Sequence, residues 1–116
     1  MTKDDILHII ESHKKAALRV KKAGFDAVQI HAAHGYLLSQ FLTPYYNRRK
    51  DEYGGSLENR MRFMDMVMEE VMKAAGSDMA VLVKMNMRDG FRGGMELDET
   101  MQVARRLEQS GAHALV

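Results

Sequence analysis

The 116-residue sequence contains no cysteine, and this absence removes several kinds of chemistry. Disulfide bonds, iron–sulfur ligation and thiolate catalysis are excluded within these residues, because each needs a cysteine side chain. A chain without cysteine suits a reducing compartment. We therefore expect a cytoplasmic protein.

Two further absences limit the partners of the chain. No apolar run approaches the roughly 20 residues that a membrane-spanning helix requires. The 17 Lys and Arg residues nearly balance the 16 Asp and Glu residues, which leaves a formal charge of +1. This is not the basic surplus of a nucleic-acid-binding protein. We expect neither a membrane nor a nucleic acid as partner.

Two glycine motifs of nucleotide-binding proteins are also missing. A Rossmann domain would show G-x-G-x-x-G after its first strand, and a phosphate loop would show G-x-x-x-x-G-K-[ST]. Neither occurs, and the predicted strand that ends at His31 is followed by Ala32-Ala33-His34-Gly35-Tyr36. Both nucleotide-binding motifs are thereby excluded.

The sequence does contain a helix, a glycine and a short apolar strand, repeated three times. Apolar residues recur at the spacing of one buried helix face, and short apolar runs after a helix are typical of buried parallel strands. Alternating helices and strands predict a parallel sheet with right-handed crossovers. The predicted helices cover residues 2–23, 56–75 and 97–110, the glycines are Gly24, Gly76 and Gly111, and the strands cover 25–31, 79–87 and 112–116.

Each predicted helix has a candidate N-cap. Thr2 is followed by Asp5 at the third helical position, which gives a capping box. Ser56 is followed by Asn59 in place of Glu or Gln, so its box is imperfect. Asp98 is the candidate cap of the third helix.

Polar residues at the strand ends favour one of two α/β architectures. His31 and His34 close the first strand, and Lys84 and Asn86 close the second. Barrels place their functional groups at such ends, although doubly wound sheets also bind ligands there. A complete (β/α)8 TIM barrel needs about 250 residues. We therefore expect residues 1–116 to form one segment, a partial barrel of about three consecutive βα units.

His31, His34 and Tyr36 are the candidate catalytic residues. Two imidazoles three positions apart can each donate an N–H to one oxygen and so stabilise developing negative charge. They could instead bind a metal ion with further ligands, or His34 could satisfy backbone groups of its loop. Tyr36 could act as a general acid, or serve as an amphipathic aromatic whose hydroxyl covers the site.

Lys84 lies in an otherwise apolar strand, where an unpaired ammonium is costly. It must reach an electron-rich ligand or pair with a carboxylate. Arg88 and Arg92 flank Gly90 in the following loop and could grip a phosphate or another anion. A solvent-exposed loop is the simpler interpretation for each arginine taken singly.

The polar connection over residues 45–55 is long for a compact domain, and such connections are usually functional. A short helix is expected before it, over residues 36–42, because Thr43 precedes a proline. We interpret the charged residues in and beside the connection as ion pairs that fix it: Arg48, Arg49, Asp51, Glu52, Glu58, Arg60 and Arg62. Three other histidines are assigned to helix faces or the core: His8, His13 and His113.

Two stretches identify a family resemblance. Residues 24–42 read GFDAVQIHAAHGYLLSQFL, which is very similar to the fourth-strand signature of Old Yellow Enzyme-type flavin reductases. Residues 44–60 read PYYNRRKDEYGGSLENR and resemble the loop and helix start that follow it. The resemblance covers essentially the whole chain, which corresponds to the middle of a barrel. It is greatest to the NADH:flavin oxidoreductase branch that includes 2,4-dienoyl-CoA reductase.

The resemblance implies an FMN cofactor reduced by NADH or NADPH, with hydride passing to the β-carbon of an activated alkene. The positions of His31 and His34 match the pair that binds the substrate's carbonyl oxygen. Tyr36 matches the tyrosine that protonates the α-carbon. Lys84 matches a basic residue, usually Arg, beside the N1–C2 oxygen region of the flavin. Lys keeps the positive charge there but loses the planar fork of Arg.

The resulting hypothesis is a portion of an FMN-dependent ene-reductase that acts on α,β-unsaturated carbonyl or enoyl thioester substrates. The chain alone should bind FMN weakly and be inactive. It should also form homo-oligomers, because an unclosed barrel exposes two sheet edges. One alternative is a non-catalytic α/β module that binds an anion or metal through His31 and His34. Another is an amine-oxidising relative, against which the two imidazole donors argue.

Overall fold

The computed structural model describes residues 1–116, and its first helix, α1 (Lys3–Lys22), begins where the sequence predicts. Thr2 Oγ1 accepts a hydrogen bond from the Asp5 N–H at 3.2 Å, and the Asp5 carboxylate accepts one from the Thr2 N–H at 2.7 Å. This reciprocal pair satisfies free N–H groups at the helix start. The predicted capping box is confirmed.

The helix–strand units follow one another in the predicted order, with a short helix after the first strand. The strands begin one or two residues later than the apolar runs suggest. The elements are α1 (Lys3–Lys22), β1 (Ala27–Ala32), α2 (Leu37–Leu42), α3 (Leu57–Ala75), β2 (Ala80–Met85), α4 (Leu97–Gln109) and β3 (Ala114–Leu115).

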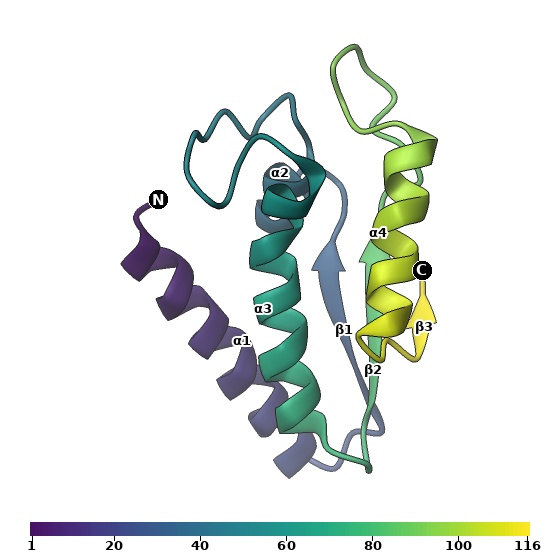
Figure 1. The fold of residues 1–116 in the computed structure, drawn as a ribbon. Coiled ribbons are helices and arrows are strands. Elements are labelled where there is room, and N and C mark those ends of the chain that lie inside the picture. Colours follow the sequence, from purple (N-terminus) through teal and green to yellow (C-terminus); the bar gives the residue numbers. More distant parts are fainter.

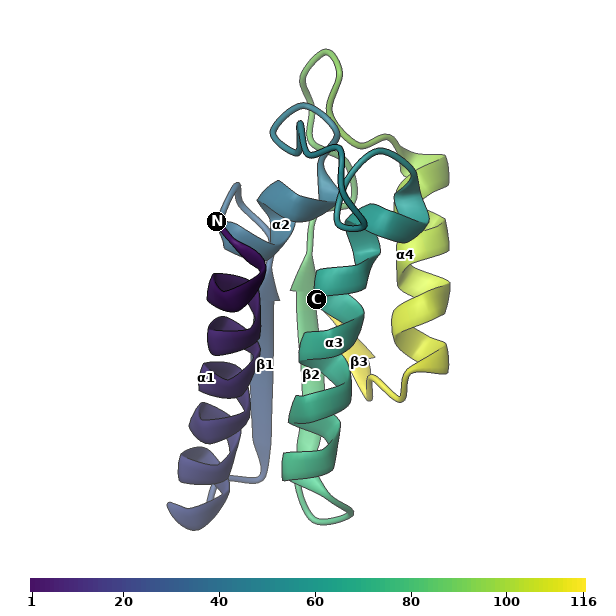
Figure 2. The same cartoon turned by 60° about the vertical axis from the view of Figure 1, so that its left-hand side comes forward.

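The three strands form one parallel sheet in the order β1-β2-β3. Figures 1 and 2 show α1, α3 and α4 on one side of this sheet, with the other side open. Along β1, Ile30 is buried beneath the helices, whereas Gln29 and His31 are exposed on the open face. A doubly wound sheet carries helices on both faces. Cover on one face only is the arrangement of a partial (β/α)8 barrel, whose interior is the open face.

Helix α3 is the centre of the hydrophobic core. It contacts α1, α2, α4 and β2, and its Phe63, Val67 and Met68 are fully inaccessible to solvent. Burying such a side chain contributes about 1.5–3 kcal/mol. This packing fixes the strands against the helical layer and so fixes where their carboxyl ends point. No helix has both the length and the apolar character needed to cross a membrane.

Two sequence predictions about single residues are wrong. The N-cap of α4 is Glu96, because the Thr100 N–H already donates to the Glu96 carbonyl at 3.0 Å. Asp98 therefore lies inside the first turn, where its charge favours the helix dipole without capping it. His113 lies neither on a helix face nor in the core. It is exposed beside β3, and its Nδ1 accepts the Val81 N–H at 3.0 Å.

Candidate active site

The carboxyl end of β1 presents His31 on the open face of the sheet. Its register partner on β2 is Lys84, so the two side chains stand next to each other on that face. Lys84 is half-buried and makes no ion pair and no hydrogen bond. No carboxylate of residues 1–116 pairs with Lys84, so within these residues its ammonium is available to a ligand.

The backbone turns sharply just after β1. His34 has a φ of +59°, a left-handed conformation that costs a non-glycine residue about 1 kcal/mol. The side chain of Asn86 offsets part of this cost, because its Oδ1 accepts the His34 N–H at 3.0 Å. The turn brings the His34 imidazole back toward His31.

Three rings gather at this end of the sheet. The His31 and His34 ring centroids are 5.1 Å apart and meet edge to face, and the Tyr36 ring lies 5.2 Å from His31. All three side chains are exposed. The two imidazoles and the Tyr36 hydroxyl make no hydrogen bond within the chain. The alternative in which the His34 side chain hydrogen-bonds to backbone groups of its own loop is therefore wrong. The three groups face solvent together as free donors.

Asp89 links the segments that carry these rings, and sequence reasoning missed it. Asn86 Nδ2 donates to Asp89 Oδ1 at 3.0 Å, while Asp89 Oδ2 accepts both the Thr43 hydroxyl and the Met95 N–H at 2.7 Å. One carboxylate thus joins the loop after β2 to the end of α2. The single hint in the sequence is the three-residue spacing of Asn86 and Asp89 before a glycine-rich stretch.

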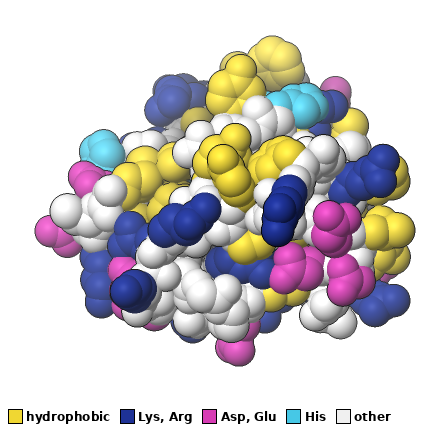
Figure 3. Space-filling view, turned by 90° about the horizontal axis from the view of Figure 1, so that it is seen from above, with side chains coloured by type: hydrophobic (Ala, Val, Ile, Leu, Met, Phe, Trp, Pro, Cys, Tyr) yellow, Lys and Arg dark blue, Asp and Glu magenta, His cyan; other side chains and the backbone are white.

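A hollow of about 300 Å³ opens next to His34 at the strand ends. Tyr46, Arg88 and Phe91 line it together with the Asn86–Asp89 pair. Viewed from this end of the molecule, exposed apolar side chains lie among Lys and Arg (Figure 3). No group of three or more His, Cys, Asp or Glu side chains is placed to hold a metal ion.

We name residues 43–56 the first loop and residues 86–96 the second loop. Within the first loop, Arg49 donates to both carboxylate oxygens of Asp51, at 3.0 and 2.5 Å. The guanidinium of Arg49 holds the pKa of Asp51 below its usual range. Arg60, only 3% exposed, donates to the carbonyls of Leu42 and Gly55 and pairs with Glu99. The prediction that ion pairs fix this loop is confirmed in part. Arg49 pairs with Asp51 as expected, whereas Glu52 and Arg60 pair with Lys3 and Glu99, outside the predicted set. The remaining three predicted residues form no ion pair: Arg48, Glu58 and Arg62.

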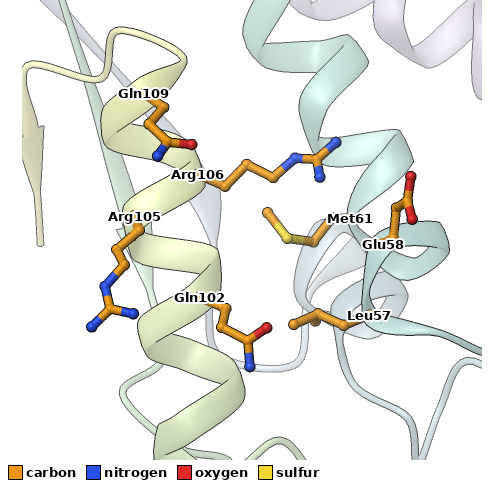
Figure 4. A pocket seen from close by; sticks show the side chains of 7 residues that line it. All are labelled: Leu57, Glu58, Met61, Gln102, Arg105, Arg106 and Gln109. Atoms are coloured by element: carbon orange, nitrogen blue, oxygen red, sulfur yellow. The ribbon is translucent and has the colours of Figure 1, made fainter.

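Another hollow, also of about 300 Å³, lies between α3 and α4. Figure 4 shows Arg106 extending from α4 toward α3, above Met61 and Leu57. Arg106 pairs there with Asp65 at 2.8 Å. This hollow belongs to the outer helical layer and contains none of the residues at the strand ends, so we place it outside the candidate site.

Parallel βα units with imidazole, phenol and ammonium groups at the carboxyl ends of the strands have the arrangement in which barrel enzymes carry their active sites. Comparison with known protein families identifies one family that matches nearly the whole chain. Residues 1–115 match the model of the NADH:flavin oxidoreductase / NADH oxidase family. The chain belongs to this family.

Three similar proteins illustrate the relationship. The NADPH dehydrogenase of Clostridium acetobutylicum is 50% identical over 94 residues, which are 81% of this chain and 27% of that protein. The structure of 2-naphthoyl-CoA reductase with 2-naphthoyl-CoA has a TM-score of 0.93 at 33% identity, over 98% of this chain and 17% of that one. An Old Yellow Enzyme homologue from Zymomonas mobilis has a TM-score of 0.87 at 34% identity, over 99% and 33%. The chain therefore spans at most a third of the length of these proteins.

Proposed function

We propose that residues 1–116 are the middle part of a flavin-binding barrel that reduces the carbon–carbon double bond of α,β-unsaturated carbonyl or thioester compounds. The observation that carries this proposal is the grouping of His31, His34 and Tyr36 around one point of the open strand ends, next to Lys84. All four side chains lack partners within the chain. Unpartnered donors at such a point fit a ligand that brings electron-rich atoms.

The residues present fit an FMN cofactor in one specific respect. Lys84 offers a positive charge on the barrel-interior face, and such a charge suits the electron-rich N1–C2 oxygen edge of a flavin. When bound, the flavin would supply the hydride after reduction by NADH or NADPH. Lys84 would hold and orient the ring without a carboxylate competing for its ammonium.

His31 and His34 bind the carbonyl oxygen of the substrate. Each imidazole donates one N–H, so negative charge that develops on the oxygen is stabilised by two preorganised donors. Tyr36 supplies a proton to the α-carbon from its phenol hydroxyl. This assignment is supported by the ring separations from His31, which are 5.1 Å to His34 and 5.2 Å to Tyr36 and are short enough for one small substrate to contact all three.

An enoyl thioester is the substrate class that we favour. The similar 2-naphthoyl-CoA reductase is in complex with 2-naphthoyl-CoA, an aromatic thioester whose carbonyl is likewise conjugated to carbon–carbon double bonds. A 2,4-dienoyl-CoA reductase-like branch would act on an enoyl thioester. The chain by itself has two unpaired sheet edges, on β1 and β3, so we also propose that it self-associates.

A chimera tests the function directly. This chain replaces the matching segment of the Clostridium acetobutylicum NADPH dehydrogenase, and flavin content and NADPH-dependent reduction of an enone or enoyl-CoA are measured. The chimera should be yellow and active. H31A/H34A should lower kcat/KM by about 10²–10³-fold, and Tyr36→Phe should lower kcat by at least about 10²-fold.

His8→Ala is the matched control, because His8 is exposed on α1 away from the strand ends. It should leave the rate unchanged. A flavin-loaded chimera in which H31A/H34A and Tyr36→Phe reduce the substrate at the parent rate would disprove the assignment.

A further inference from the structure

Two arginines of the second loop have no partner in the molecule. Arg88 and Arg92 are exposed and make neither an ion pair nor a hydrogen bond. The nearest carboxylate in sequence, Asp89, is already engaged by Asn86, Thr43 and Met95. The other carboxylate of this loop, Glu96, lines the same hollow but forms no ion pair, so neither arginine is paired.

The two arginines line a hollow of their own. It measures about 300 Å³ and is bounded by Arg88, Gly90, Phe91, Arg92 and Glu96. Arg88 and Phe91 also line the hollow next to His34, so the two spaces adjoin through shared side chains. Arg88 thus faces both the hollow at the strand ends and the hollow that Arg92 lines.

Two exposed aromatic rings line these hollows: Phe91 lines both, and Tyr46 lines the one next to His34. Phe91 lies 5.2 Å from Tyr45 and 5.9 Å from Tyr46, in edge-to-face contacts that join the first loop to the second. Phe91 and Tyr46 are 39% and 51% exposed. Aromatic faces that stay open to solvent next to cations are suited to a nucleobase that is linked to phosphates.

The second loop is held in a defined shape, so the arginines are carried on a fixed frame. Asp89 and Met95 exchange two hydrogen bonds across the loop, and the Gly94 N–H donates to the Phe91 carbonyl at 3.1 Å. A Cβ at Gly94 would lie 2.6 Å from the Asp89 side chain, which shows how closely the two arms approach.

We propose that Arg88 and Arg92, together with the exposed rings of Tyr46 and Phe91, form a subsite for the adenosine phosphate part of a ligand whose reactive end lies at His31 and His34. The subsite rests on the proposed function for the identity of that reactive end. Two ligands share the required chemistry: a coenzyme A thioester carries a ribose 3′-phosphate, and NADPH carries a ribose 2′-phosphate.

Binding is measured with three probes on the 116-residue chain at low ionic strength, because exposed charges are screened by salt. The probes are pyrophosphate, adenosine 3′,5′-bisphosphate and adenosine 2′,5′-bisphosphate. Their binding is measured by calorimetry or by amide chemical shifts. Tighter binding of the 3′,5′ isomer identifies the thioester, and tighter binding of the 2′,5′ isomer identifies NADPH. Equal binding still supports a phosphate subsite that does not read the ribose position.

The variants separate the phosphate contacts from the base contact. R88Q/R92Q should weaken all three probes about tenfold. Phe91→Leu should weaken the two nucleotides about fivefold and leave pyrophosphate unchanged. Glu96→Gln removes the one carboxylate that lines the hollow, so it should tighten all probes. Arg105→Gln is the control, because Arg105 is an exposed arginine of α4 outside both hollows.

The proposal is overturned if no probe binds, or if R88Q/R92Q binds every probe within twofold of the parent and Arg105→Gln. The same probes are also tested as inhibitors of the chimera, so the stability of the isolated chain does not decide the result. Since probe binding needs neither flavin nor hydride transfer, its failure is distinct from failure of the reductase function. If the chimera is inactive but the chain still binds the nucleotides, only the proposed reductase function is refuted.

Discussion

Two loops cross the carboxyl ends of the strands, and they use arginine in opposite ways. Arg49 of the first loop is bound to Asp51, and Arg60 at the start of α3 binds the carbonyls that surround that loop. Arg88 and Arg92 of the second loop bind nothing within the chain. The same residue type is an internal crosslink in one loop and an open cation in the other.

The difference follows from burial. A guanidinium taken out of water must have its N–H groups satisfied, or its desolvation cost is not recovered. Arg60 meets this condition through two backbone carbonyls and the carboxylate of Glu99. An exposed guanidinium keeps its hydration and can exchange water for a ligand. The first loop is therefore scaffold, and the second is available for binding.

Replacing Arg60 should give the largest effect on stability. Arg60→Met removes the donors of two backbone carbonyls and leaves Glu99 without its partner, so we expect a loss of about 3–5 kcal/mol. Urea denaturation followed by circular dichroism measures it. Arg88→Met, the counterpart in the second loop, should change the stability by less than about 0.5 kcal/mol. Equal losses in the two variants would erase the contrast between the loops.

Glycine substitutions test the same contrast at the backbone. A Cβ at Gly54 would lie 2.3 Å from the carbonyl oxygen of Arg49, so Gly54→Ala should force the first loop apart at a cost of about 2–3 kcal/mol. Gly90 has no atom within 4 Å of such a Cβ, and only its φ of +73° opposes alanine, at about 1 kcal/mol. Urea midpoints of the two variants give both values. A Gly90→Ala variant that is the less stable of the two would contradict this ranking.

The sequence was sufficient where a local pattern determines the structure. Helical periodicity and the Thr2–Asp5 capping box placed α1, and short apolar runs placed the strands to within two residues. His31, His34 and Tyr36 could be grouped because only five positions separate them.

Long-range contacts could not be predicted in this way. The Asp89 contact with Thr43 spans 46 positions and that of Arg60 with Glu99 spans 39, and both depend on how the loops meet above the strands. No single-sequence pattern encodes such a meeting. Lys84 illustrates the same limit. Its position near a strand end could be predicted from the sequence, but its neighbour could not, because the pairing register that places it beside His31 is a long-range contact.

Asn86 joins the second loop to the candidate site, so its replacement tests whether that loop only binds or also positions His34. Asn86→Ala removes the acceptor of the His34 N–H, and we expect a loss of about 1 kcal/mol. Hydrogen exchange of the His34 amide should speed up while the amides of α3 are unaffected. Met87→Ala, at a side chain that is 70% exposed, is the control. An unchanged His34 amide in Asn86→Ala would mean that Asn86 does not support this turn.

Acid should loosen the first loop, although less than any of these substitutions. Arg49 holds the folded-state pKa of Asp51 below its ordinary value of 3.8, so the pair stabilises the loop above that value. This stabilisation is lost as the pH falls through the lowered folded-state pKa, where Asp51 becomes neutral. The Tyr53 N–H, which donates to Asp51 Oδ1 at 3.2 Å, reports the change as an amide chemical shift that titrates below pH 3.8. Asp51→Asn should remove that step, because an amide has no proton to gain in this range. A Tyr53 amide that titrates equally in both chains would show that the Arg49–Asp51 pair does not control the acid response of the loop.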